Sequence, residues 1–558
     1  MTSAALGVIL RSRRALSLAA LLLASESQGL AIDFTDQSMQ IKDTGTPANN
    51  YTSKGIADGS GKLIGPGGKL AYSANSPSPK MCLQSNGLFG WTPHNLYLNS
   101  GSPANQSVTV ISGLTYAIDI TGSVSVAVSG AATGTLTAGT TAFTAATGTL
   151  TFGSTSGSGT VQVRRTPSAS TYVATGASAV YSLPYEWNTS GVCQGVLEEE
   201  QRASLWLQSN TFGTTWTATN LTDLTTTTTG PDGVAGSMVR LNETTTNAAH
   251  NVNQSITKAA SALAYVSTVF AKQGVGRTRV YGQLDDGSGN GVYAVFDLAG
   301  GQVGVTATGL GTPFTSLSAQ IISLGNGVYR CILIATTSTG TTLKGSWGND
   351  SGSGTGALSN SYAGTIGNGC YIYQAQLEQA SYISSPLGGS PIFTTTATVT
   401  RAADQPTLAA SAFPTSNVTG SAYAKYAFAN TAPTVSSDAG ILTMTDQAGR
   451  MLYAHYAGSG ITGHLDSYDG TAVLDSGVLA SASMQKAASS WAASTLAISV
   501  AGSNAVTGSF DGTMGAATTL LFGLRDSGGG SVLNGYLAQA LVLPRAMSTA
   551  ELKAQSTP

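Results

Sequence analysis

Apolar and hydroxyl-bearing residues alternate along much of this chain, and glycine interrupts the alternation every few residues. Between residues 107 and 163 the pattern runs through segments such as TVISG, YAIDITG and VSVAVSG. A period of two places alternate side chains on opposite faces of a β-strand, and glycine favours the turns between strands. Similar segments recur at 262–379 and 421–548. The pattern therefore predicts an all-β protein, with several β-sandwich or jelly-roll modules in series.

Changes in composition indicate where the modules meet. LQSN followed by Phe and Trp occurs at 83–91 and again at 207–216, and this internal repeat indicates duplicated entry strands. A tract rich in Pro, Gly and Thr at 384–408 is typical of an extended linker. We predict an apolar segment with a short helix or leader at 1–31, a loop-rich segment at 32–80, a Thr-, Ala- and Gly-rich β module at 81–185, a carbohydrate-binding-like β-sandwich at 186–404, and a jelly roll at 405–558.

The two ends of the chain carry helix signals. STAELKAQ at 548–555 predicts a short last helix, capped by Ser548 or Thr549 with Glu551 in its first turn. Residues 11–31 carry a basic cluster, an apolar run and a small-residue ending, the order of a secretory signal peptide. The run is too short for stable membrane insertion, and its helical spacing also suits a peptide that docks in a groove of another protein. Both interpretations stay open.

Charge and cysteine content limit the partners and cofactors that we expect. The chain has 25 Lys and Arg against 27 Asp and Glu, so no sustained positive field attracts nucleic acid. The four cysteines form no C-x-x-C pair, and we predict no metal site and no other cofactor. Cys331 and Cys370 fall in apparent strands of one module. They either pair in an oxidising compartment or remain small buried hydrophobic residues.

A run of charge at residues 198–202, EEEQR, stands out because only 9 % of residues are charged. Glycoside hydrolysis requires two carboxyl groups that face each other about 5–9.5 Å apart. Since neighbours in a strand point to opposite faces, only Glu198 and Glu200 satisfy that condition. The alternative is a polar strand edge where Arg202 pairs with a glutamate. We favour the strand edge, so we predict no catalytic residues and no enzyme.

Residues 451–470 are the best candidates for ligand contact. Sugars bind to flat aromatic faces and a few aimed polar groups, and this segment supplies both. The alternative is that its tyrosines are ordinary sandwich residues. We expect Trp206, Trp216 and Trp347 to lie in a core. The candidate ligand-binding residues are Tyr453, His455, Tyr456, His464, Asp466 and Tyr468.

Five landmarks taken together resemble the modular spike and tail-fibre proteins of tailed bacteriophages and gene transfer agents, especially head spike fibre proteins. The landmarks are AIDFT at 31–35, SVSVAVSGAATGTLTAG at 123–139, GVLEEEQRASLWLQSNTF at 195–212, CYIYQAQLEQASYISSP at 370–386 and TVTRAADQP at 398–406. The last module, 405–558, resembles a laminin-G or concanavalin-A-like jelly roll through LNGYLAQALVLPRAMSTAEL at 533–552.

This resemblance implies a non-enzymatic protein of the virion surface that binds bacterial cell-surface polysaccharide and so serves host adhesion. It also implies an N-terminal peptide that anchors the chain to virion capsid or tail proteins, and a homo-oligomer, with a trimer expected. In an oligomer, several weak sugar-binding sites would act together and so raise the overall affinity through avidity. One alternative is a secreted or surface-attached bacterial adhesin whose leader is cut after Ala31. The other is a polysaccharide depolymerase tailspike that uses Glu198 and Glu200.

Overall fold

The computed structural model forms two compact units built almost entirely of β-strands, which confirms the predicted fold class. The central unit spans Ala74–Asp404, and the C-terminal unit joins strands from the start of the chain to Gln405–Pro558. Residues 1–29 of the predicted leader or anchor and most of segment 32–80 lie outside the described residues, whereas Leu30 and Ala31 are described as part of β1 (Leu30–Asp33). The structure describes residues 30–35, 40–41, 52–53, 64–65, 68–69, 71–72 and 79–558, with gaps at 225, 313, 410–416, 430–437, 445–448, 456–462, 515–518, 526–530 and 544.

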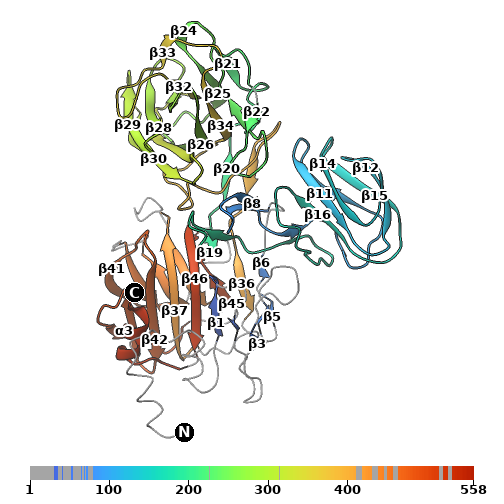
Figure 1. Cartoon of the computed structure of the whole chain (residues 1–558). Coiled ribbons are helices and arrows are strands. Elements are labelled where there is room, and N and C mark those ends of the chain that lie inside the picture. The colour runs from blue at the N-terminus through green and yellow to red at the C-terminus, as the bar shows by residue number, and fades with distance from the viewer. Residues whose placement is uncertain are drawn as a thin grey trace. The chain divides into compact units, whose positions relative to one another are not determined.

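The Thr-, Ala- and Gly-rich part of the central unit is a small two-sheet sandwich (Figure 1). Its core is formed by inward-facing residues such as Tyr116, Val126 and Leu150, while hydroxyl residues cover the outside. One sheet has the order β10 (Gln106–Thr109), β15 (Thr149–Ser156), β12 (Ser125–Gly130) and β13 (Gly134–Leu136). The other has β14 (Gly139–Thr144), β11 (Thr115–Ile120) and β16 (Val161–Arg165).

A larger sandwich of two six-stranded antiparallel sheets follows in the central unit. The first sheet has the order β21 (Thr217–Thr219), β25 (Asn251–Thr257), β32 (Thr342–Asp350), β27 (Arg279–Asp285), β28 (Gly291–Asp297) and β29 (Gln302–Leu310). The second has β22 (Thr226–Thr228), β23 (Met238–Arg240), β34 (Gly369–Glu378), β26 (Ala264–Val275), β31 (Val328–Thr336) and β30 (Thr315–Ser323).

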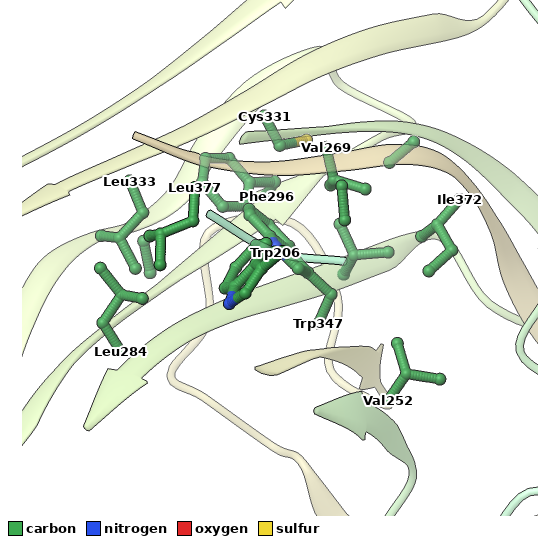
Figure 2. Packing of buried hydrophobic residues seen from close by; sticks show 14 of the residues in the cluster. Trp206, Val252, Val269, Leu284, Phe296, Cys331, Leu333, Trp347, Ile372 and Leu377 are labelled. Carbon is green, nitrogen blue, oxygen red and sulfur yellow. The ribbon is translucent and has the colours of Figure 1, made fainter. Parts of the chain in front are cut away.

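Strand β31 shows why these sequences form a sandwich. Cys331 and Leu333 point into the core between the two sheets, whereas Ile332 and Ile334 belong to a separate apolar cluster. Figure 2 shows Trp206 and Trp347 at the centre of the main core, surrounded by aliphatic side chains. Both tryptophans are fully buried and Trp216 packs beside them, so the expectation that they are core residues is confirmed.

A hairpin of β7 (Met81–Leu83) and β8 (Phe89–Trp91) carries the first LQSN segment in its turn region. Met81, Phe89 and Trp91 pack against residues of the large sandwich, including Phe270 and Phe393. The hairpin therefore packs on the outer face of the sheet that contains β26, in an apolar cluster separate from the main core. The remaining short pairs are β9 (His94–Asn95) with β17 (Val180–Tyr181), β18 (Tyr185–Trp187) with β19 (Cys193–Glu198), β20 (Arg202–Ser204) with β35 (Val399–Arg401), and β24 (Asn247–Ala249) with β33 (Ser361–Ala363).

The C-terminal unit is a second large sandwich. Strand β46 (Gly535–Leu543) pairs with β1 (Leu30–Asp33) on one side and with β37 (Thr419–Phe428) on the other (Figure 1). Strands β42 (Gln485–Ala492), β43 (Thr495–Val500) and β44 (Val506–Ser509) continue this sheet. The facing sheet has the order β41 (Val473–Leu479), β40 (His464–Tyr468), β39 (Gly449–Ala454), β38 (Ala439–Met444), β45 (Thr519–Phe522), β36 (Pro406–Ala409) and β6 (Ala71–Tyr72).

Helix α3 (Thr549–Ser556) closes the chain as the sequence predicts. Ser548 is its N-cap, and the side chain of Glu551 returns to the backbone N–H of Ser548 to complete a capping box. Leu552 is buried against the C-terminal sandwich. Among the described residues, no helix is long and apolar enough to cross a bilayer.

Candidate functional site

A cleft of about 560 Å³ opens on the central unit. Its floor is aromatic, because Trp91, Tyr373 and Phe393 line it with little exposed surface. The more exposed lining residues carry mostly uncharged hydroxyl or amide groups: Ser112, Thr115, Gln208, Asn210, Thr211, Ser237, Thr395 and Thr396. An apolar floor with several uncharged polar groups above it is the usual chemistry of a small-molecule or sugar site.

The second LQSN segment forms one wall of this cleft. The backbone N–H of Gln208 donates to Thr395 O at 2.8 Å, and the indole N–H of Trp216 donates to the carbonyls of Leu207 and Gln208. Asn210 Oδ1 accepts the backbone N–H of Gln374 at 2.7 Å. These hydrogen bonds hold residues 207–210 in place along the cleft. The prediction of an entry strand is wrong for this copy of the repeat, because residues 205–216 form turns and bends, and its place in a cleft was not predicted.

Two charged side chains also line the cleft. Asp232 is nearly buried, and its carboxylate accepts hydrogen bonds from Tyr373 Oη at 2.9 Å and Ser237 Oγ at 2.7 Å. The Arg165 guanidinium lies over the Trp91 ring, 4.9 Å from its centroid, and also lines a neighbouring cavity of about 390 Å³. The Asp232 carboxylate is thus engaged within the protein, and the more exposed lining groups are neutral.

The residues predicted to bind a ligand lie in the C-terminal unit, except that Tyr456 is outside the described residues. Tyr453 lies on β39, His455 directly follows that strand, and His464, Asp466 and Tyr468 lie on β40. Tyr453 is fully buried and belongs to the interior. The guanidinium of Arg450 lies about 5 Å from the rings of both Tyr453 and Tyr468. Tyr468 is half-buried, and its hydroxyl donates to Gly470 O at 2.6 Å.

Histidine and aspartate side chains pair in this same region. His455 Nδ1 lies 2.9 Å from Asp466 Oδ2, and His464 Nδ1 lies 2.9 Å from Asp475 Oδ1. Asp466 and Asp475 are direct cross-strand partners of β40 and β41. The structure therefore brings His455 together with Asp466, while His464 pairs with Asp475, which the sequence interpretation omitted.

Stability of the C-terminal unit is expected to depend on the protonation of Asp466. Burial, followed by the negative charge of Asp475, raises the pKa of Asp466 to about 7. Because the folded state holds this proton more tightly than the unfolded chain, the stabilisation is fully present below about pH 4 and is lost as pH rises through 7. Asp466→Asn cannot ionise. Its midpoint in urea, compared with that of the wild type from pH 4 to 8, should lack this decline; parallel curves would contradict the assignment.

The glutamate run lies in the central unit, where Glu198 and Glu199 are buried, and it lines neither cavity described above. Glu199 is fully buried, with its carboxylate 3.3 Å from both Lys80 Nζ and Arg401 Nη1, and it accepts hydrogen bonds from Ser384 and Ser390. Burial by itself would raise the pKa of Glu199, but Arg401, Lys80 and the serine hydroxyls lower it below its ordinary value.

The other two glutamates of the run have different surroundings. Glu198 is fully buried, whereas Glu200 is a quarter exposed and pairs with Arg202 at 2.5 Å. The expected pairing of Arg202 with a glutamate is confirmed. The expectation of a polar strand edge is wrong for Glu198 and Glu199, because β20 and β35 bring Arg401 to the run and Lys80 also reaches it.

No disulfide joins any of the four cysteines, all of which lie in the described part of the chain. Cys82, Cys331 and Cys370 are fully buried, and burial raises the pKa of Cys370 to about 12. Only Cys193 is partly exposed. We therefore expect one thiol to react with a disulfide reagent in the native protein and four after unfolding. Two reactive thiols after unfolding would instead indicate a Cys331–Cys370 bond.

The described part of the chain contains no group of three or more His, Cys, Asp or Glu side chains that could hold a metal ion. No family model matches the chain, and no curated protein sequence matches it. Among solved structures, domains LG4-5 of the mouse laminin alpha1 chain match with 10 % identity and a TM-score of 0.16, covering 56 % of this chain and 92 % of that chain. The fold and the cleft define an all-β protein of sandwich modules with an aromatic-floored, mostly neutral cleft.

Proposed function

We propose that this protein is a non-enzymatic adhesion protein that binds bacterial cell-surface polysaccharide through the cleft of the central unit. The observation that carries the proposal is the lining of the cleft, where aromatic rings form the floor and uncharged hydroxyl and amide groups form the exposed rim. Sugar rings present apolar C–H faces and many hydroxyls, which such a lining matches.

The state of the glutamates supports a binding role over hydrolysis. Glu199 is held by Lys80 and Arg401, and Glu198 has no solvent-exposed surface that a polysaccharide would reach. A depolymerase that used this run would need both carboxyl groups of its catalytic pair at an open groove.

The proposal of a virion setting rests on the five sequence landmarks, which resemble segments of spike and tail-fibre proteins. In that setting the chain projects from a virion as a homo-oligomer, with its N-terminal peptide attached to capsid or tail proteins, and several shallow sugar sites act together. A secreted or cell-surface adhesin would use the same cleft. The N-terminus of the mature chain separates the two settings: a chain cut after Ala31 supports secretion, and one that begins at Met1 or Thr2 supports the virion.

Retention of the purified full-length chain on immobilised capsular and lipopolysaccharide glycans tests the binding role. We expect saturable retention on at least one glycan. Replacing Gln208 and Thr211 with alanine should weaken it about tenfold, since each removes about one hydrogen bond. Gln201→Ala is the matched control, because Gln201 is exposed and lies outside the cleft. Failure to bind any glycan would contradict the proposal.

A further inference from the structure

Lys80 and Asp404 are in direct contact in the interior of the central unit, although 324 residues separate them in sequence. Lys80 lies near the start of the unit, and Asp404 is its last residue. Both side chains are almost completely buried. The Lys80 ammonium also donates to Leu197 O at 3.0 Å and lies 3.3 Å from the Glu199 carboxylate. A buried lysine is therefore held against a buried carboxyl group where the two ends of the unit meet.

The carboxyl group of Asp404, like the ammonium group of Lys80, is held in place by hydrogen bonds to the backbone. Its Oδ2 accepts the backbone N–H of Glu199 at 2.8 Å, and the backbone N–H of Asp404 donates to Glu199 O at 3.0 Å. These reciprocal bonds hold the carboxyl carbon beside Lys80 Nζ. Holding two reacting groups in place in this way replaces a collision between molecules with an intramolecular step.

Glu198 is the third member of the cluster, and it is unlike its neighbours. It is fully buried, and neither of its carboxyl oxygens has a hydrogen-bond partner among the described residues. Burial, and then the negative charge of Asp404, raises the pKa of Glu198 well above its ordinary value, which favours the protonated form of its carboxyl group. A buried polar group without a partner is costly, so the position of Glu198 calls for an explanation.

We infer that Lys80 and Asp404 condense to form an intramolecular amide cross-link, with Glu198 as the group that transfers protons. The ammonium proton of Lys80 first passes to the Asp404 carboxylate, which gives a neutral amine and a neutral acid. The nitrogen lone pair then forms the Nζ–Cγ bond, while the proton of Glu198 goes to the Asp404 carbonyl oxygen. Glu198 next takes a proton from the nitrogen and gives it to one of the two hydroxyls, whose C–O bond breaks as one water molecule leaves. Glu198 then takes the proton of the remaining hydroxyl, which leaves a neutral amide carbonyl and returns Glu198 to its protonated form.

Charge is balanced in the buried cluster before and after this step. In the ion-paired state, Lys80 and Arg401 offset Asp404 and Glu199. Once the amide forms, Arg401 and Glu199 remain paired at 3.3 Å and no uncompensated charge is left by the reaction. Because the interior has a low dielectric constant, exchanging a buried ion pair for a neutral amide also removes the cost of keeping two ions out of water.

The cross-link would join the two ends of the central unit covalently. Tension applied along the chain at Lys80 and Asp404 would pass through the amide bond, so the sandwiches between these residues would not be pulled open. An adhesion protein held between two bodies experiences such tension. The cross-link itself does not depend on glycan binding, and its test is independent of that proposal.

Peptide mapping of the purified full-length chain by mass spectrometry tests the inference. We expect a branched peptide that joins the segment with Lys80 to the segment with Asp404, lighter by one water molecule than the two separate peptides together. A map in which both segments are recovered only as linear peptides would overturn the inference.

Variants identify the role of Glu198. General acid–base catalysis contributes about 10²–10⁴-fold, so Glu198→Gln should slow formation of the branched peptide by about that factor. Glu200→Gln, in the same run but a quarter exposed, should leave it unchanged. Native tryptophan fluorescence shows whether each variant is folded. A folded Glu198→Gln protein that cross-links at the wild-type rate would exclude Glu198 as the proton-transfer group. If the variant does not fold, the peptide map of the wild-type chain still decides whether the Lys80–Asp404 cross-link exists.

Discussion

Replacing Glu199 with glutamine is expected to lower the free energy of unfolding of the central unit by about 3–5 kcal/mol. The carboxylate lies 3.3 Å from Arg401 Nη1 and accepts hydrogen bonds from Ser384 Oγ and Ser390 Oγ at 2.7 and 2.5 Å. Glutamine keeps the volume but removes the negative charge, so the buried Arg401 guanidinium and Lys80 ammonium both lose a buried carboxylate. The midpoint of urea unfolding, followed by tryptophan fluorescence, measures the loss.

Glu200→Gln is the matched control for this substitution. Glu200 is a quarter exposed, and its partner Arg202 also lies 3.6 Å from Glu378. Arg202 therefore keeps a carboxylate when Glu200 is neutralised, and we expect a loss of less than about 1 kcal/mol. Equal effects of the two substitutions would contradict the view that Glu199 anchors the buried network.

Replacing Gly345 with alanine is expected to destabilise the large sandwich of the central unit by about 1–3 kcal/mol. Gly345 lies on β32, and a Cβ at this position would overlap the ring of Trp206 around Cζ2. Trp206 has little room to move, because it packs 5.0 Å from Trp216 by ring centroids and lies in the same core cluster as Trp347 (Figure 2). The same urea measurement reports the change.

Gly153→Ala separates this steric effect from the loss of glycine as such. Gly153 also lies in a strand, β15, but a Cβ there meets no atom within 4 Å. Since alanine restricts the unfolded chain more than glycine does, this control should be neutral or slightly stabilising. If Gly345→Ala is as well tolerated as Gly153→Ala, the packing around Trp206 is looser than described.

The fold class was predictable because a period of two survives in the sequence wherever one face of a strand is buried. Strand β15 shows the principle, since Leu150 and Phe152 are buried while Thr151 between them stays partly exposed. The pairing of β1 with β46 was not predictable. A four-residue strand carries too little pattern to identify a partner about 500 residues away, and only the hydrogen bonds of the folded sheet reveal it.

The buried glutamates were missed for a related reason. A run of three carboxylates is locally polar, and its burial depends on Lys80 and Arg401, which are remote in sequence. In segment 451–470 the difficulty is different, because the residues are close in sequence but their burial could not be predicted. Its aromatic and polar residues are close in sequence, but the pattern alone did not show that Tyr453 is fully buried while Tyr468 stays partly exposed.

Hydrogen exchange of the full-length chain, with and without a retained polysaccharide, tests most directly that the cleft of the central unit binds glycan. Residues on its walls should exchange more slowly in the complex, namely 208–211, 232–237 and 393–396. Protection that instead appears only at 451–470, with these walls unchanged, would contradict the account and place the binding site in the C-terminal unit.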